Sequence, residues 1–287
     1  MTPSETEPFE LPGTAHVGQA ALRVDTFDHV LAFYRETIGL AVERDGNVAW
    51  LSGAGGTPIL RLTADPDAPA RPGDAAGLYH VAIRVPDRSV LGDVCARLQA
   101  EPWAFTGASD HGVSEALYMR DPAGNGIEVY RDRDRADWPP AADGFVGMVT
   151  DPLDVDDLVA DRRGTDAVPA GTDIGHVHLE VTDRERAEAF YRGTLGLRLR
   201  DRYGDAAAFL AAGDYHHHVG INTWEGRTAP AGATRGLDWW ELVVPTEAVL
   251  ATVVERLEAD DYAVEPTADG VETGDPDGIR LRLRVAD

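Results

Sequence analysis

Short stretches of alternating apolar and polar residues run along the chain and are separated by glycine and aspartate turns. The segment GLYHVAIRVP at 77–86 is typical of a short strand, and residues 89–100 then follow a helical period. The apolar stripe of that helix consists of Leu91, Val94, Cys95 and Leu98. A Gly-Asn-Gly break at 124–126 precedes another alternating strand at 127–130. The pattern predicts a strand, a helix and several short strands.

This order of elements recurs along the chain. DTFDHVLAFYRETIGL, which begins at Asp25, matches TDRERAEAFYRGTLGL, which begins at Thr182. GLYHVAIRVP is similar to GLDWWELVVP, which begins at Gly236, and each is followed by an amphipathic stretch and an Asp-Pro turn. The repeat divides the chain into four similar units, numbered one to four: 16–66, 77–131, 174–224 and 236–286.

Each unit is predicted to fold as βαβββ, which makes the chain an α+β protein. One such unit buries too small a core to be stable alone, so we expect the units to pair into curved sheets. We expect residues 1–13 to form a flexible tail, residues 14–131 a first domain of two units, and residues 174–287 a second. Segment 132–173 should be an ordered crossover, because it contains apolar anchors such as Leu153 and Leu158.

The four βαβββ units and the FYR-x-x-x-GL motif resemble the vicinal oxygen chelate superfamily, which includes glyoxalases and extradiol dioxygenases. The resemblance covers nearly the whole chain except the tail and the segment 132–173. It implies cup-shaped half-barrel sheets in which two units surround one metal. The first strand of each unit then supplies a ligand, and the last strand of one supplies a glutamate. The strings DHGVSEALY and YHHH look like the catechol-2,3-dioxygenase type.

The resemblance assigns the metal ligands to His80, Glu128 and His176. Each histidine lies seven residues before the aspartate of a turn, and Glu128 follows an Asp-Pro turn. The equivalent positions of units one and four hold side chains that cannot together bind a hard divalent cation: Gln19, Trp239 and, approximately, Arg280. We therefore predict that unit two pairs with unit three around the metal, and unit one with unit four. Sequential pairing of one with two and three with four is the alternative.

Two neutral imidazoles and one carboxylate leave three positions of a metal open, which suits an Fe(II) site for an organic substrate and O2. Mn(II) accepts the same ligands. The resemblance also assigns three catalytic residues. His217 would be the acid–base residue, because it is the second histidine of a pair at the family's spacing after Phe209. Tyr118 lies ten residues before Glu128 and would bind substrate. His111, at a looser spacing, would face the substrate as well.

The run of three histidines is expected on a strand, with His216 and His218 on one face and His217 on the other. A metal-scavenging cluster is the alternative. His178 shares a strand face with His176, so it either lines the pocket or stands behind the ligands. Trp239 is a further candidate for substrate binding. The other aromatic candidates for the pocket wall are Trp224, Trp240 and Tyr215.

The resemblance implies an extradiol ring-cleaving dioxygenase that inserts O2 next to the diol of a catechol-type substrate. His217 would take a substrate proton, and the product would be a hydroxymuconic semialdehyde. Two alternatives remain. A lactoylglutathione lyase (glyoxalase I)-like metalloenzyme needs a second carboxylate ligand, where unit three has histidines. A ligand-sequestering protein of the bleomycin-resistance kind has no metal in its pocket, so iron content discriminates that class.

The balance of charge is strongly acidic. The formal net charge is −24 and every basic side chain apart from histidine is arginine. Nucleic acid is therefore not an expected partner, because phosphate binding needs a basic surface. The acids are spread over the whole chain, which we interpret as adaptation to high salt.

Cellular location and assembly follow from simpler features. The single cysteine, Cys95, allows no disulfide within the chain, which is typical of a reducing compartment. We find no long apolar run and no signal-peptide pattern, so a cytoplasmic protein without a membrane partner is expected. A small aromatic diol and O2 would be its partners. Because the superfamily often assembles through sheet edges, the resemblance also allows a homo-oligomer.

Overall fold

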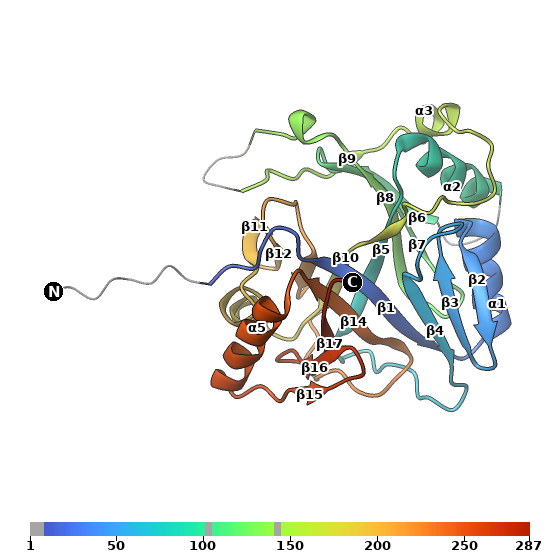
Figure 1. Cartoon of the computed structure of the whole chain (residues 1–287). Coiled ribbons are helices and arrows are strands. Elements are labelled where there is room, and N and C mark those ends of the chain that lie inside the picture. Colours follow the sequence, from blue (N-terminus) through green and yellow to red (C-terminus); the bar gives the residue numbers. More distant parts are fainter. Residues whose placement is uncertain (1–8, 101–104, 141–144) are drawn as a thin grey trace.

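The computed structural model of the chain describes residues 9–100, 105–140 and 145–287. Its strands form two curved sheets, one of eight strands and one of nine (Figure 1). Each of the four units contributes a strand, a helix and three further strands in that order. The α+β class and the four-unit organisation are confirmed.

Units one and two contain the following elements. Unit one consists of β1 (His16–Val24), α1 (Phe27–Ala32), the π-helical turn η1 (Phe33–Ile38), β2 (Ala41–Asp45), β3 (Val48–Ser52) and β4 (Leu60–Ala64). Unit two consists of β5 (Gly77–Arg84), α2 (Arg88–Ala100), β6 (Phe105–Asp110), β7 (Ser114–Arg120) and β8 (Gly126–Asp132). The predicted helix at 89–100 is therefore present.

Units three and four repeat this order after a crossover. The crossover contains η2 (Arg135–Asp137), β9 (Asp151–Pro152) and α3 (Val155–Ala160). Unit three consists of β10 (Asp173–Glu180), α4 (Arg184–Glu188), the π-helical turn η3 (Ala189–Thr194), β11 (Arg198–Tyr203), β12 (Ala207–Ala211) and β13 (Val219–Asn222). Unit four consists of β14 (Gly236–Val244), α5 (Glu247–Ala259), β15 (Glu265–Pro266), β16 (Gly270–Gly274) and β17 (Arg280–Val285).

The strand order shows how the units pair. The nine-stranded sheet runs β11-β12-β13-β10-β5-β8-β7-β6-β9, and the eight-stranded sheet runs β15-β16-β17-β14-β1-β4-β3-β2. At the centre of each sheet the first strands of two units pair antiparallel, β5 with β10 and β1 with β14. The predicted pairing of unit two with three and unit one with four is confirmed. Each sheet thus combines one unit from either half of the sequence.

Contacts between helices and turns connect the units in a different way. Tyr34 of the first FYR motif donates to Asp121 in the Asp-Pro turn of unit two (3.1 Å), and Tyr191 donates to Asp275 in unit four (2.9 Å). Arg97 of α2 likewise donates to the carbonyl of Thr37 at the end of η1 (2.9 Å). Strands therefore join unit two to unit three and unit one to unit four, whereas these polar contacts join unit one to unit two and unit three to unit four.

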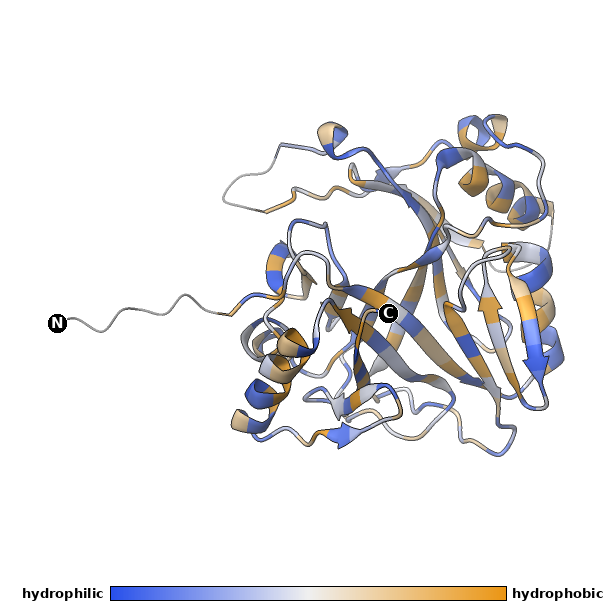
Figure 2. Ribbon diagram, viewed as in Figure 1, coloured by the Kyte–Doolittle hydropathy of each residue, from blue (hydrophilic) through white to orange (hydrophobic). Residues whose placement is uncertain are grey.

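The core is continuous across the four units. One cluster of buried apolar side chains includes members from every unit, among them Cys95 and Leu98 of α2. Apolar residues follow the central strands, whereas α2 and α5 alternate between apolar and polar segments (Figure 2). None of the helices in the described ranges is both long and apolar enough to cross a membrane.

The start of the chain is packed from Phe9 onward. Leu11 is buried and its amide donates to the carbonyl of Gly196 (2.8 Å), and Arg256 lies over the Phe9 ring. Residues 9–13 are therefore held against units three and four and do not form part of a free tail. The rest of the predicted tail, residues 1–8, lies outside the described residues.

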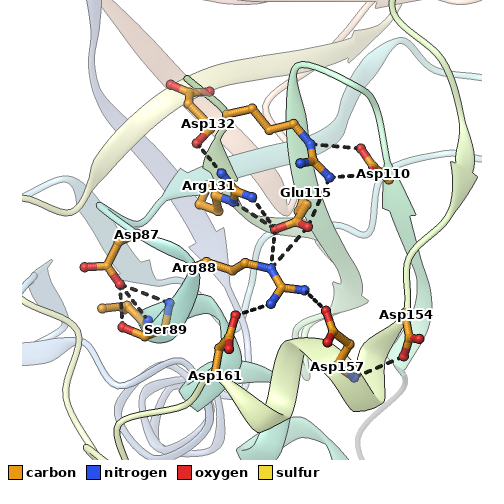
Figure 3. Close-up of polar contacts among 12 residues, drawn as sticks. Asp87, Arg88, Ser89, Asp110, Glu115, Arg131, Asp132, Asp154, Asp157 and Asp161 are labelled. Atoms are coloured by element: carbon orange, nitrogen blue, oxygen red, sulfur yellow. Dashed lines mark hydrogen bonds and ion pairs between the residues drawn. The ribbon is translucent and has the colours of Figure 1, made fainter. Parts of the chain in front are cut away.

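The crossover is fixed to unit two by ion pairs (Figure 3). Glu115 of β7 is almost fully buried and accepts from Arg88 (3.0 Å), Arg131 (2.8 Å) and Arg133 (3.2 Å). Arg88 also donates to Asp157 of α3 (2.8 Å). The crossover is therefore ordered where it is described; its residues 141–144 lie outside the described ranges.

Candidate functional site

The three predicted metal ligands come from adjacent strands of the nine-stranded sheet. His176 of β10 and Glu128 of β8 lie on either side of Ala82 in β5, and His80 lies two residues before Ala82. Residues at such positions share one face of a sheet. Since Ala82 is small and fully buried, it leaves space above the strand for the larger ligand side chains.

The ligand atoms converge on one point. Glu128 Oε2 lies 2.9 Å from His80 Nε2 and 3.2 Å from His176 Nε2, and the two histidine nitrogens are 3.3 Å apart. All three residues are buried, and among the described residues they form the one group with metal-binding spacing. The pairing of units two and three brings together ligands that are far apart in the sequence.

The electrostatics of the site favour deprotonated ligands. Burial lowers the pKa of His176 to about 4, although Glu128 opposes the shift. Burial raises the pKa of Glu128, but His176 and His80 outweigh it and hold that pKa well below its usual value. At neutral pH His176 is therefore an uncharged base and Glu128 a carboxylate. One hydrogen cannot serve as the bonding partner of all three atoms, the two imidazole nitrogens and the carboxylate oxygen. A divalent cation would bind all three. The residues fit a metal.

A cavity of about 620 Å³ opens in front of these ligands. Its wall is rich in rings, which come from β5, β7, β10, β12 and the segments after β12 and β13: Tyr79, Tyr118, His178, Phe209, His217 and Trp224. Met148 and Val149 of the crossover also line it. The volume and the aromatic wall are typical of a small-molecule site.

Tyr118 and His111 form a hydrogen-bonded pair at this cavity. Tyr118 lies opposite Glu128 in the β7–β8 register and therefore faces the ligands. Its hydroxyl is 2.7 Å from His111 Nε2, and His111 Nδ1 is 2.7 Å from the carbonyl of Val149. The carbonyl can only accept, so His111 Nδ1 donates to it, and in the neutral imidazole the Nε2 lone pair accepts from Tyr118. Burial and the charge of Glu128 raise the pKa of Tyr118 well above its usual value, which keeps it a phenol.

The histidine run does not lie on a strand, so the predicted alternation of His216, His217 and His218 is wrong. The chain leaves β12 and turns at Gly213, where φ is +59° and a Cβ would lie 2.5 Å from the Cα of Gly13. All three histidines lie in the connection from β12 to β13 and are buried. A left-handed glycine interrupts the two-residue period of a strand, which is why alternation does not apply here.

His217 is the member of this run that reaches the cavity. Its ring centroid lies 4.1 Å from that of His176 and 5.1 Å from that of Phe209. Burial and the neighbouring His176 and His216 hold the pKa of His217 well below its usual value. His217 is therefore an uncharged base at the cavity wall at neutral pH.

The structure separates the two predicted substrate-binding residues. His178 lies opposite His80 in the β5–β10 register, lines the cavity, and has an Nε2 atom without a hydrogen-bond partner among the described residues. Trp239 does not line this cavity. It lies on β14 of the other sheet, opposite Ala21, with the guanidinium of Arg282 4.0 Å from its ring centroid. Because Trp239 is the unit-four equivalent of His80, it occupies the corresponding place in the other sheet.

Of the remaining aromatic candidates, some lie at the cavity wall and others do not. Trp224 lines the cavity, whereas Trp240 is fully buried in the core. Tyr215 is hydrogen-bonded to Tyr130 (2.7 Å) and Asp132 (3.1 Å), away from the cavity. These contacts give Tyr215 a role in holding Asp132.

Several residues of the site were not predicted from the sequence. Alternation would place Tyr79 on the opposite face from His80, but a register irregularity between His178 and Leu179 occurs at this point and Tyr79 lines the cavity. Met148 and Val149 belong to the crossover, where no periodic pattern marks them. The last residue of β8, Asp132, contacts His216 at 2.9 Å. The position of Asp132 four residues after Glu128 was the sequence feature that could have indicated its place near the site.

Comparisons with known proteins agree with this geometry. The model of the Glyoxalase/Bleomycin resistance protein/Dioxygenase superfamily matches residues 16–129 and 173–283. The chain is 40% identical over 269 residues to a protein of Bacillus subtilis (strain 168) named catechol-2,3-dioxygenase, a match that covers 91% of this chain and 94% of the relative.

Solved structures show the same fold at low sequence identity. A crystal structure of a Bacillus subtilis subsp. subtilis str. 168 protein aligns with a TM-score of 0.65 at 12% identity, covering 96% of this chain and 86% of the other. Glyoxalase I from Zea mays aligns with a TM-score of 0.57 at 16% identity, covering 94% and 92%. The fold is thus shared by proteins whose sequences have diverged widely.

Proposed function

Because the chain belongs to the glyoxalase/bleomycin resistance protein/dioxygenase superfamily, we propose that it is an extradiol ring-cleaving dioxygenase. It would insert O2 next to the diol of a catechol-type substrate at a mononuclear Fe(II) site, with Mn(II) as the other metal that the ligands suit. The curated relative at 40% identity, named catechol-2,3-dioxygenase, supports this activity.

One observation carries the proposal. The His80, Glu128 and His176 side chains converge at the base of a cavity that also contains His217 and the Tyr118–His111 pair. Two imidazoles and one carboxylate would hold the metal, which when bound supplies Lewis acidity toward the diol and open positions for substrate and O2. The remaining side chains supply proton transfer and substrate binding.

His217 is proposed as the acid–base residue. It is an uncharged imidazole at the cavity wall at neutral pH, so its free nitrogen can accept the proton of a substrate hydroxyl and later return it. Tyr118 and His111, which remain hydrogen-bonded to each other, are placed to bind a substrate oxygen. His178, which also lines the cavity, is proposed as a further residue at the substrate.

The ring-lined wall supports an aromatic diol as the substrate. Tyr79, Phe209 and Trp224 offer ring faces and edges to a planar molecule. Glyoxalase I-like chemistry would need a second carboxylate beside the metal. Within the described ranges, Glu128 is the only carboxylate in the ligand group. A metal-free binding protein would have no use for three convergent buried ligands.

The test is anaerobic loading of the protein with iron(II), followed by catechol and air while the visible spectrum is recorded. We expect one iron per chain and a yellow ring-opened product. Glu128→Ala should lose both iron and colour, because a buried carboxylate ligand is removed. His217→Ala should retain iron and lose turnover by about 10²–10⁴-fold, which is the usual contribution of general acid–base catalysis. His16→Ala removes an exposed histidine outside the cavity and should leave both unchanged.

The other outcomes identify the alternatives. Iron without colour, followed by turnover of a hemithioacetal, would replace the dioxygenase with glyoxalase chemistry. A protein that binds no metal but holds an aromatic ligand would be a sequestering protein. Both results would contradict the proposal.

A further inference from the structure

A second histidine lies directly behind His217, away from the substrate cavity. His216 is fully buried, with 0% of its surface exposed. Its Nδ1 atom lies 2.8 Å from His217 Nδ1, and its Nε2 atom lies 2.9 Å from Asp132 Oδ1. The three side chains therefore form a continuous hydrogen-bonded series from Asp132 to His217.

Asp132 is held in place by residues from several elements. Arg84 of β5 donates to it (3.0 Å), and the hydroxyl of Tyr215 lies 3.1 Å from its Oδ2. Burial raises the pKa of Asp132, but His216 and Arg84 outweigh it and lower that pKa below its usual value. Asp132 is thus an ionised acceptor whose position is determined before any substrate binds.

The hydrogen bonds determine which nitrogens carry hydrogen. A carboxylate can only accept, so His216 donates from Nε2. Neutral His216 then has a lone pair on Nδ1, and the 2.8 Å contact between the two Nδ1 atoms requires a hydrogen on His217. Neutral His217 has one N–H, so its other nitrogen, Nε2, has a lone pair.

We propose that Asp132 and His216 are positioning residues that hold His217 in the tautomer with hydrogen on Nδ1 and a lone pair on Nε2. The proposal rests on the role of His217 as base in the proposed function. When His217 Nε2 takes the substrate proton, one O–H bond is broken and one N–H bond is formed. The resulting imidazolium continues to donate from Nδ1 to His216. The opposite tautomer would present an N–H to the substrate and could not act as a base.

The first measurement is ¹⁵N NMR of the histidine rings in the full-length protein without iron, since iron(II) is paramagnetic. Ring nitrogen shifts distinguish a nitrogen that carries hydrogen from one with a lone pair. We expect hydrogen on Nε2 of His216 and on Nδ1 of His217. Hydrogen on Nε2 of His217, or on both nitrogens of His216, would overturn the proposal. This readout needs no catalytic activity and no variant that has to fold.

The second measurement compares two asparagine variants. In Asp132→Asn the amide can donate to His216 and reverse both tautomers, so we expect kcat to fall by about 10²–10⁴-fold with KM little changed. Asp173→Asn is the matched control, because Asp173 also pairs with Arg84 (2.6 Å) but makes no contact with His216 that the structure records. An equal loss of kcat in both variants would mean that Asp132 acts only through Arg84, which would overturn the proposal.

The two hypotheses fail in different ways. If the wild type opens no diol, the proposed function fails and the nitrogen spectrum still decides the tautomer. If the wild type is active but the spectrum shows the reversed tautomer, the positioning role fails and the proposed function stands.

Discussion

At the scale of single residues, small and buried side chains prepare the site. Ala82 lies between the strands that hold His176 and Glu128, and a larger residue there would fill the space that the ligands occupy. Gly126 permits the close approach of β8 to β5, because a Cβ would lie 1.9 Å from the carbonyl oxygen of Tyr79. The ligand geometry therefore depends on residues that have no chemistry of their own.

His218 illustrates how a buried histidine makes stability depend on pH. Its Nδ1 accepts from the amide of Ala212 (3.1 Å), and burial lowers its pKa to about 3. Below pH 6.5 the unfolded chain binds a proton that the folded chain does not, so the free energy of unfolding falls as pH falls. The slope is about 1.4 kcal/mol per pH unit for this one group.

We therefore expect His218→Gln, which keeps an acceptor and removes the titration, to be less sensitive to acid than the wild type. The measurement is urea unfolding of both proteins between pH 7 and pH 4.5. The stability difference, wild type minus variant, should fall by roughly 2–3 kcal/mol over this range. Parallel stability curves would contradict the assignment of a lowered pKa to His218.

At the scale of elements, the repeated motifs are explained by contacts between units. The tyrosine of each FYR motif donates to the aspartate of the Asp-Pro turn in the following unit, Tyr34 to Asp121 and Tyr191 to Asp275. Burial raises the pKa of Asp275 to about 7. The FYR motif and the Asp-Pro turn, which look independent in the sequence, thus supply the donor and the acceptor of one hydrogen bond.

The ion-pair cluster around Glu115 fastens β7, α2 and the crossover together (Figure 3). Glu115→Ala leaves Arg88, Arg131 and Arg133 without their shared buried acceptor, so we expect a loss of roughly 3 kcal/mol of unfolding free energy in urea denaturation. Asp157→Ala is the matched control, because Asp157 pairs with Arg88 but is largely exposed. It should cost less than about 1 kcal/mol. Equal losses would show that burial of Glu115 is not what makes the cluster stabilising.

At the scale of the whole molecule, charge is the dominant property. There are 50 acidic residues against 26 basic ones, so the acids that remain after ion pairing repel one another across the surface. Salt shortens the range of this repulsion from about 30 Å at 0.01 M to about 3 Å at 1 M. The folded state brings the charges closer together than the unfolded chain and therefore benefits more from screening.

We expect the melting temperature to rise as KCl increases from 0.05 M to 2 M. Each kcal/mol of repulsion that salt screens should raise the melting temperature by about 2–4 °C, the value typical of chains somewhat shorter than this one. Circular dichroism melts measure the effect, and sucrose, which is excluded from the surface but does not screen charge, is the control. A melting temperature that rises equally in sucrose, or falls in KCl, would refute adaptation to salt.

The residue pattern and the family resemblance were enough to predict the four units, their element order and the candidate ligands. Periodic strands and helices mark their own faces, and the absence of ligand chemistry at Gln19 and Trp239 was sufficient to predict which units pair. The positions of the non-periodic segments became known only from the folded chain. The turn at Gly213 took the histidine run off its expected strand, and the crossover brought Val149 to His111.

Long-range strand pairing explains why some positions could be predicted and others could not. The contact of His216 with Asp132 joins a connection in unit three to the end of a strand in unit two. No local pattern encodes such a contact, because it exists only after β5 and β10 have paired. Residue types and spacing thus indicated a metal and a base, and the family resemblance supplied the expected reaction, whereas the arrangement that orients these groups required the folded sheet.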